Sequence, residues 1–303
     1  MKHARRSIVT VAAGAAACAL LAPIPLGSQV TSRIVMLGTG TPRLNPDRSG
    51  PATAIVVGDR TFLVDIGPGV VRRAAAAAAG LPAVDPVKIS TAFITHLHSD
   101  HTVGYPDLIL MPWIFGRKTL DVYGPEGTEE MTKYLLMAYR RDIENRTTGI
   151  HKLAPLVARG HDVKPGVVFK DDRVTVKAFR VPHGSWAPNA FGYRFETPDR
   201  VIVISGDTSP SEEVVANCRP CDVLIHEVQL PDYNVPTVAD WKGYRARYHT
   251  TTDQLAELAN RAKPGLLVAY HNGGGEDALG QILEQIQRTY KGKVVVARDL
   301  DVF

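Results

Sequence analysis

Several residue types are scarce in this 303-residue sequence, and each scarcity narrows the class of protein. Aromatic residues make up 7% and charged residues 22%, against 45% hydrophobic residues, a balance that excludes disordered chains, collagen and coiled coils. Three cysteines are too few for a disulfide-rich scaffold. The net charge is only +4, and residues 1–30 hold three of the basic residues and no acid, which leaves +1 for the remainder. So small a net charge on residues 31–303 does not predict binding to nucleic acid through bulk charge.

Long apolar segments are missing as well. Residues 8–22 form an uncharged, alanine-rich run that is shorter than the ~20 residues needed to span a bilayer. A basic start precedes this run, which is typical of a secretory signal. We therefore predict a signal peptide at about residues 1–30, one domain at residues 31–303, and a periplasmic or secreted protein without stable membrane insertion. The Arg5-Arg6 pair leaves both Sec and twin-arginine export open.

Only Cys218 and Cys221 remain after such processing, in the sequence Cys-Arg-Pro-Cys. A thioredoxin-type motif should open a helix after a strand, but this one precedes the strand-like run 222–225. A local disulfide formed outside the cytoplasm and two idle thiols are the favoured alternatives.

The pattern of β-branched residues and turn residues predicts a mixed α/β protein. Strands are expected at 34–37, 54–57, 61–64, 92–95, 174–181, 190–195, 201–205, 223–226, 266–269 and 294–297. Helices are expected at 70–79, 129–141, 252–262 and 276–290, with a loose connection over 145–170. Strand-rich runs in both halves, each followed by helices, favour a layered α/β sandwich over alternating βαβ units.

Histidines carry the strongest functional signal. His96, His98, Asp100 and His101 lie within six positions, directly after an apolar strand. Imidazole nitrogen and carboxylate oxygen are preferred ligands of zinc and similar cations. Because Leu97 separates the first two histidines, both can face one metal ion, while the next two side chains reach a neighbouring position. The sequence thus predicts a metal site at the end of this strand.

Three further candidates follow other apolar runs. His183, Asp207 and His271 each lie just after a strand-like segment. Since strand ends converge at one edge of a sheet, these side chains can join the first histidines. A carboxylate such as Asp207 can also bridge two cations through its two oxygens.

This pattern resembles the metallo-β-lactamase fold superfamily. The motif HxHxDH is present at residues 96–101. The family's other motifs match, in the same order along the chain, at Asp65, His183, Asp207 and His271. The resemblance covers about residues 33–303. The resemblance implies a four-layer αββα metallo-β-lactamase sandwich, a single domain after the signal peptide, and two divalent ions, with Zn²⁺ as the expected metal.

The resemblance also implies how the ligands divide. One ion takes His96, His98, His183 and Asp207, and the other takes Asp100, His101, Asp207 and His271. Two such ions lower the pKa of a bridging water toward neutrality, so the implied nucleophile is a metal-bridging hydroxide. Asp100 is thereby assigned to catalysis as well as to metal binding.

Shorter motifs resemble the RNase Z and arylsulfatase-like branch of the superfamily. They are residues 37–42, 205–208 and 225–227, and the triplet that begins at His249. By this resemblance His249 protonates the leaving oxygen, and Glu227 orients the imidazole ring of His249. Histidine suits this role because it titrates near the working pH.

Departures from RNase Z decide the sequence-based prediction. Residues 272–275 replace the Ser and Arg-Tyr pair that RNase Z favours, no clear basic arm for tRNA is present, and the leader removes the enzyme from tRNA. We therefore predict an exported dinuclear hydrolase of small esters, arylsulfatase-like or phosphodiesterase-like, with a small-molecule ester substrate and no nucleic-acid partner. A homodimer is compatible with this prediction. The alternatives are an RNase Z-type endoribonuclease, a lactonase, or a non-hydrolytic metal-binding member of the fold.

Overall fold

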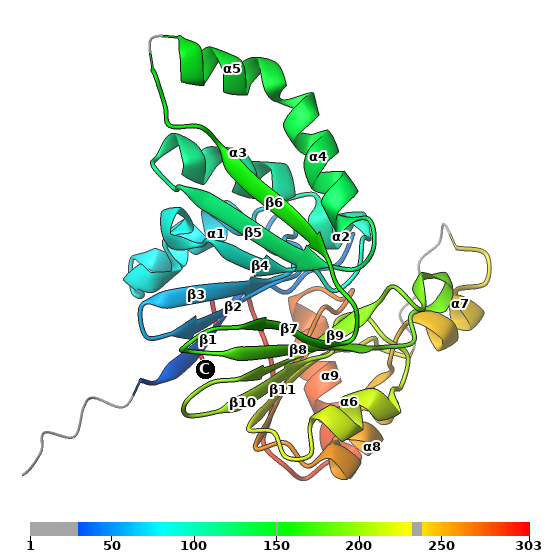
Figure 1. The fold of residues 1–303 in the computed structure, drawn as a ribbon. Coiled ribbons are helices and arrows are strands. Elements are labelled where there is room, and N and C mark those ends of the chain that lie inside the picture. Colours follow the sequence, from blue (N-terminus) through cyan, green and yellow to red (C-terminus); the bar gives the residue numbers. More distant parts are fainter. Residues whose placement is uncertain (1–29, 150, 232–237) are drawn as a thin grey trace, which may run out of the picture.

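Two β-sheets face each other and carry helices on their outer faces (Figure 1). The computed structural model describes residues 30–149, 151–231 and 238–303, so nearly all of the predicted signal peptide lies outside the described residues. Among the described residues, no helix has the length and apolar character needed to cross a membrane.

The first sheet contains six strands in sequence order. They are β1 (Ser32–Gly38), β2 (Ala52–Val57), β3 (Arg60–Val64), β4 (Thr91–Phe93), β5 (Thr119–Gly124) and β6 (Val157–Asp162). Alternation along a strand sends side chains to opposite faces, so Phe62 and Val64 point into the space between the sheets while Leu63 points outward. The outer face is covered by α1 (Val70–Ala78) and α3 (Tyr105–Ile114).

The second sheet contains seven strands in the reverse of their sequence order. From one edge to the other they are β13 (Val294–Val296), β12 (Leu266–Tyr270), β11 (Val223–Glu227), β10 (Val201–Ile204), β9 (Phe191–Glu196), β8 (Thr175–Arg180) and β7 (Gly166–Lys170). Its outer face is covered by α6 (Glu212–Asn217), α8 (Thr252–Ala262) and α9 (Glu276–Thr289). Helix α8 begins where predicted because Thr251 and Gln254 form a reciprocal capping box.

An apolar core fills the space between the two sheets. Phe93 lies at its centre, with its ring 5.4 Å from that of Tyr193 and 5.5 Å from that of Phe195. Helices, sheet, sheet and helices therefore form four layers, which confirms the predicted αββα sandwich and its single domain.

Residues 145–170 differ from the prediction. Instead of a loose connection, the chain continues through α5 (Arg140–Thr148) and then forms β6 and β7. Both strands lie at sheet edges and are half-exposed, so they lack the apolar alternation that marks a strand in sequence. The helix predicted over 129–141 is two helices, α4 (Thr128–Ala138) and α5, because the backbone leaves the helical region at Tyr139.

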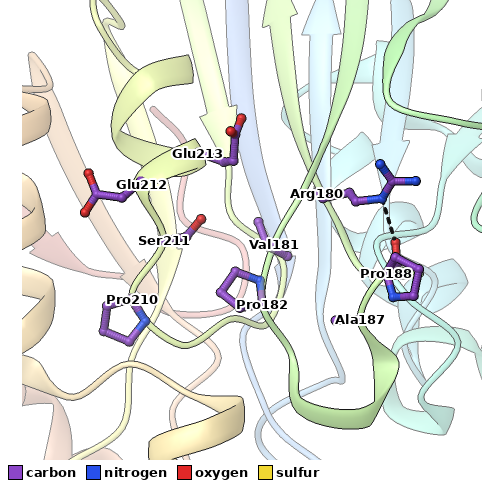
Figure 2. Close-up of a pocket in the computed structure, with 9 residues that line it drawn as sticks. All are labelled: Arg180, Val181, Pro182, Ala187, Pro188, Pro210, Ser211, Glu212 and Glu213. Carbon is purple, nitrogen blue, oxygen red and sulfur yellow. Dashed lines mark hydrogen bonds between the residues drawn. The ribbon is translucent and has the colours of Figure 1, made fainter.

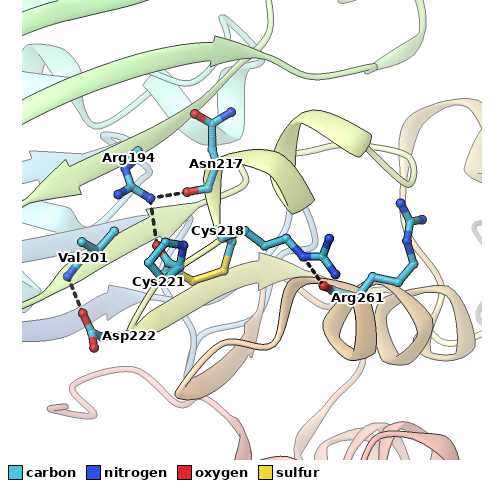
Figure 3. Close-up of a disulfide and its surroundings, with 9 residues drawn as sticks. Arg194, Val201, Asn217, Cys218, Cys221, Asp222 and Arg261 are labelled. Carbon is cyan, nitrogen blue, oxygen red and sulfur yellow. Dashed lines mark hydrogen bonds between the residues drawn. A yellow bond between two sulfur atoms is a disulfide. The ribbon is translucent and has the colours of Figure 1, made fainter.

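Cys218 and Cys221 form a disulfide between the end of α6 and the start of β11 (Figure 3). Arg194 fastens this corner to β9, since its Nη1 donates to the carbonyl of Pro220 at 3.0 Å and to that of Asn217 at 2.5 Å. Of the alternatives for these cysteines, the structure shows the local disulfide.

Candidate metal centre

Parallel strands bring the predicted ligands to one edge of the second sheet. Strands β10, β11 and β12 are mutually parallel, and β8 runs the same way because antiparallel β9 separates it from β10. His183, Asp207 and His271 each follow the carboxyl end of one of these strands. The side chains therefore meet although 88 residues separate the first from the last.

The first sheet contributes the histidine motif. His96 and His98 lie in the turn after β4, and Asp100 and His101 lie in α2 (Ser99–Thr102), a single helical turn. All four side chains except that of His98 are buried, and His98 is half-buried. The motif thus faces the strand ends of the opposite sheet.

One cluster joins His96, His98, His183 and Asp207, whose ligand atoms all lie within 4.8 Å of one another. Nδ1 of His98 lies 2.8 Å from Nε2 of His96 and 3.2 Å from Nε2 of His183. The Oδ2 atom of Asp207 lies 3.9 Å from Nε2 of His96. Three imidazoles and one carboxylate are a donor set typical of zinc.

A second cluster joins Asp100, His101 and His271 within the same limit. The Oδ2 atom of Asp100 lies 3.2 Å from Nε2 of His271 and 3.6 Å from Nε2 of His101. The other oxygen of Asp207, Oδ1, lies 3.4 Å from Nε2 of His101 and 3.5 Å from Nδ1 of His271. Asp207 therefore presents one oxygen to each cluster, as a bridging carboxylate would.

Hydrogen bonds fix which ring nitrogen faces each cluster. Nδ1 of His101 donates to Asp65 at 2.8 Å, and Nδ1 of His183 donates to the carbonyl of Tyr248 at 2.8 Å. Nδ1 of His96 lies 3.0 Å from the hydroxyl of Thr95, which itself donates to Asp65. In each case the contact at Nδ1 leaves Nε2 as the ring nitrogen that faces the cluster.

The backbone of Asp65, whose carboxylate binds His101 and Thr95, is strained. Its φ of 61° lies in the left-handed region, where a residue other than glycine is uncommon. The carboxylate accepts from the backbone N of Thr95 at 2.8 Å as well as from His101. It therefore orients the predicted ligand His101 through the ring nitrogen that points away from the cluster.

The electrostatics of the clusters fit bound cations. Burial lowers the pKa of His183 to about 4, so its lone pair is available. Burial alone would raise the pKa of Asp207, but His271 and His101 outweigh it and hold that pKa well below its usual value. Nε2 of His101, Oδ1 of Asp207 and Nδ1 of His271 are buried without a hydrogen-bond partner. Buried polar atoms are rarely left so, and two divalent ions would satisfy them.

His249 and Glu227 form a buried pair beside both clusters. Nδ1 of His249 lies 3.1 Å from Oε1 of Glu227, and its ring lies 5.5 Å from that of His183 and 6.4 Å from that of His271. Burial alone would lower the pKa of His249, but the Glu227 carboxylate outweighs it and raises that pKa. The same Oε1 accepts from the backbone N of Thr250 at 3.1 Å, which keeps Glu227 in place. The imidazole is thus oriented and has Nε2 free.

Sequence reasoning missed Trp186, to which no local pattern points. It lies in the turn Gly184–Trp186 and hydrogen-bonds His98 through its indole nitrogen, and its ring lies 4.9 Å from that histidine. Helix α7 (Trp241–Tyr248) stacks Tyr244 on Tyr248 at 4.2 Å beside His249. In the sequence, the position of these aromatic residues just before His249 points to a place beside the site.

A separate cavity of about 360 Å³ lies next to the segment that carries His183 (Figure 2). Pro182 and Pro210 form part of its apolar wall, and at one end Nε of Arg180 donates to the carbonyl of Pro188 at 3.3 Å. The predicted metal ligands do not line this cavity. It is therefore distinct from the metal centre.

Comparisons with known proteins agree with this geometry. Residues 60–272 match the family model described as Beta-lactamase superfamily domain. Ribonuclease Z of Mycobacterium bovis (strain BCG / Pasteur 1173P2) is 31% identical over 283 residues, which cover 88% of this chain and 96% of the relative. Ribonuclease Z of Mycobacterium sp. (strain KMS) is 35% identical over 244 residues, covering 78% and 83%.

Solved structures show the same fold. The metallo-β-lactamase fold protein YhfI from Bacillus subtilis superposes with a TM-score of 0.70 at 18% identity, covering 90% of this chain and 99% of that one. Human tRNase Z, short form, superposes with a TM-score of 0.66 at 23% identity, covering 89% and 98%. At these identities the likeness concerns the fold alone.

Two predictions from the sequence were wrong. The relatives named ribonuclease Z, similar over most of their length, favour the alternative of an RNase Z-type enzyme over an arylsulfatase-like hydrolase of small esters. They likewise contradict the expectation of a small-molecule ester substrate without a nucleic-acid partner. The argument from bulk charge failed because a net charge summed over the whole chain does not report the charge at one site. The chain belongs to the metallo-β-lactamase superfamily, as a metal-dependent hydrolase related to ribonuclease Z.

Proposed function

We propose that this protein is an RNase Z-type endoribonuclease that hydrolyses a phosphodiester bond in RNA, with a tRNA precursor as the substrate of the first assay. Relatives named ribonuclease Z support it at 31% and 35% identity over most of the chain. Human tRNase Z, short form, adds a similar fold.

The buried Glu227–His249 pair is the observation that carries this proposal. It lies beside the two clusters of ligand-type side chains, with a 3.1 Å hydrogen bond between the carboxylate and Nδ1. A ribose oxygen is a poor leaving group unless it is protonated, so an RNA hydrolase needs an acid at this place. An aryl ester has no such need, which is why the pair favours RNA.

The reaction requires two proton transfers, and the chain supplies the one to the leaving group. The P–O bond to the leaving ribose oxygen breaks while a P–O bond forms to the oxygen of a water molecule, which gives one proton to solvent. Protonated His249 donates its Nε2 proton to the leaving oxygen and regains a proton from solvent, and Glu227 stabilises the imidazolium before the transfer and holds the ring. When bound, two divalent ions lower the pKa of water and offset the negative charge of the phosphodiester.

Zinc is the metal that we propose for both positions. The supporting feature is the donor set, in which His96, His98 and His183 supply nitrogen and Asp100 and Asp207 supply oxygen, with further imidazoles in the second cluster. Elemental analysis of protein purified without chelator should find about two zinc ions per chain. Iron with a visible absorption band would overturn the choice of zinc and favour redox chemistry.

RNA cleavage by the zinc-loaded domain 31–303 tests the function. A 3′-extended tRNA precursor and an unstructured RNA should be offered in parallel, together with an acyl-homoserine lactone. Cleavage of the precursor at one position, abolished by chelator and by Asp207→Ala, is the expected result. Hydrolysis of the lactone with both RNAs left intact would overturn the proposal, as would RNA cleavage that persists in Asp207→Ala.

We also propose that residues 1–30 direct export, so that the RNA substrate is met outside the cytoplasm. The basic start and the uncharged run at 8–22 support this, and the Cys218–Cys221 disulfide suits an oxidising compartment. A reporter fused to residues 1–30 should leave the cytoplasm. Changing Arg5-Arg6 to Lys-Lys should stop only twin-arginine export. A reporter that remains in the cytoplasm, uncleaved, would contradict export.

A further inference from the structure

The loop that follows β12 has little of its own to hold it in place. It reads His271-Asn272-Gly273-Gly274-Gly275, and three consecutive glycines bring no side chains to pack. His271 itself has a φ of 46°, in the left-handed region that disfavours a residue with a Cβ. Yet the His271 ring is buried, 2% exposed, and lies within 3.5 Å of two carboxylates. Something outside the loop must therefore fix its backbone.

Arg48 makes the contacts that do so. Its Nη1 donates to the carbonyl of Asn272 at 3.1 Å, to the side-chain oxygen of Asn272 at 3.0 Å and to the carbonyl of Gly274 at 2.9 Å. Its Nε and Nη2 donate to the hydroxyl of Thr39 at 3.2 and 3.1 Å. The planar guanidinium thus joins the loop after β12 to the loop after β1, a geometry that a lysine ammonium cannot reproduce.

The guanidinium of Arg48 forms these hydrogen bonds with neutral acceptors, namely carbonyl oxygens, a hydroxyl group and an amide side chain. The carboxylate of Asp299 accepts from the backbone N atoms of Thr39 at 2.9 Å and Ser49 at 2.7 Å and lies 3.2 Å from Nε of Arg73. Asp299 therefore holds the loop that carries Arg48, while Arg48 holds the loop that carries His271. Hydrogen bonds from a charged donor to carbonyls are about twice as strong as neutral ones.

Gln229 makes a second contact with the backbone of this loop. Nε2 of Gln229 donates to the carbonyl of His271 at 3.1 Å, and the backbone N of Gln229 donates to the carbonyl of Thr250 at 2.8 Å. His271 is thus fixed at its own carbonyl by Gln229 and one residue later by Arg48.

We propose that Arg48 is a positioning residue for the second metal ion, which it serves by holding the triglycine loop so that His271 keeps its ligand position. This inference rests on the proposed dinuclear centre. The first cluster contains no residue of this loop, so loss of Arg48 should weaken one binding step and leave the other unchanged.

Stepwise zinc titration against a chromophoric chelator tests the inference. In Arg48→Lys the affinity of the binding step that fills the second cluster, here called the second step, should fall by about 10- to 100-fold, the range typical of partners that orient a metal ligand. The first step should be unchanged. Hydrogen exchange of the Gly273–Gly275 amides should accelerate in the same variant, and this readout does not depend on activity.

Two matched controls separate positioning from general destabilisation. Arg43→Lys removes an exposed guanidinium that makes one 3.0 Å bond to the carbonyl of Gly273, and both binding steps should persist. Arg117→Lys removes another buried guanidinium, which donates to the carbonyls of Leu108 and Ile109 in α3. It should lower the melting temperature and leave the second step intact.

Several outcomes would overturn the inference. An unchanged second step in a folded Arg48→Lys variant would do so, as would an equal loss of both steps in Arg48→Lys and Arg117→Lys. If Arg48→Lys does not fold, Asn272→Ala replaces it, since it removes the 3.0 Å side-chain contact, and an unweakened second step there would count against the inference. A wild-type protein that binds only one ion would instead refute the proposed dinuclear centre.

Discussion

His249→Ala removes the proposed acid without touching either cluster of ligand-type side chains. If the imidazole protonates the leaving ribose oxygen, RNA cleavage should slow by about 100- to 10,000-fold, the usual contribution of general acid catalysis. Metal content should remain at the wild-type level, because the ring of His249 lies 5.5 Å from that of His183 and is in neither cluster.

The structure sets the size of the accompanying stability loss. Removing His249 deprives the buried Glu227 carboxylate of its 3.1 Å partner, although the backbone N atoms of Thr250 and Thr208 still donate to it at 3.1 and 3.3 Å. A buried acceptor that loses one of its partners costs about 1–3 kcal/mol. The assay must therefore be run well below the melting temperature. Glu227→Gln keeps an oxygen that can accept from Nδ1, so its effect on turnover should be milder.

The leaving group distinguishes an acid from a binding residue. Single-turnover rates should be measured for an RNA substrate and for bis(4-nitrophenyl) phosphate, whose nitrophenolate departs without a proton. The loss in His249→Ala should be large for RNA and small for the nitrophenyl ester, whereas Asp207→Ala should abolish both with loss of metal. An equal loss for both substrates in His249→Ala would refute the acid role and assign the residue to substrate binding.

Three further predictions concern the scaffold. Asp65→Asn should weaken metal affinity by about 10- to 100-fold in a chelator titration, because His101 loses the carboxylate that orients it. Cys218→Ser with Cys221→Ser opens a four-residue loop and should cost about 2 kcal/mol in urea unfolding, and an unchanged midpoint would contradict this. Burial lowers the pKa of His226 to about 4, so its folded form resists protonation while the unfolded chain accepts a proton below about pH 6.5. Stability should therefore fall by roughly 3 kcal/mol between pH 6.5 and 4, and His226→Gln should reduce this slope.

Local sequence determined the layers of this fold. Strand geometry places Phe62 and Val64 on one face of β3 and Leu63 on the other, and the structure shows that the first face meets the opposite sheet and the second the helices. The capping box of Thr251 likewise fixed the start of α8. Edge strands β6 and β7 escaped prediction, because a strand paired on one side and half-exposed need not alternate.

The sequence also determined the candidate ligands, because few residue types bind divalent ions and they stand at the ends of apolar runs. The sequence predicts Asp207 as a bridge, and in the structure its two oxygens face different clusters. Its two-sided placement depends on the turn after β10 and on histidines more than 60 residues away, which only the tertiary structure brings together. The roles of these side chains as ligands remain predictions to be tested by the titrations above.

Only the tertiary structure decided what holds the ligands. The carbonyl of Tyr248 orients His183 from 65 positions away, and Arg48 reaches the backbone of Asn272 across 224 positions. A backbone carbonyl has no sequence signature, and an arginine in a glycine-rich loop looks like any solvated arginine. Composition could not decide the substrate either, since a net charge is a sum over the whole surface while recognition depends on the few groups that meet at one edge of a sheet.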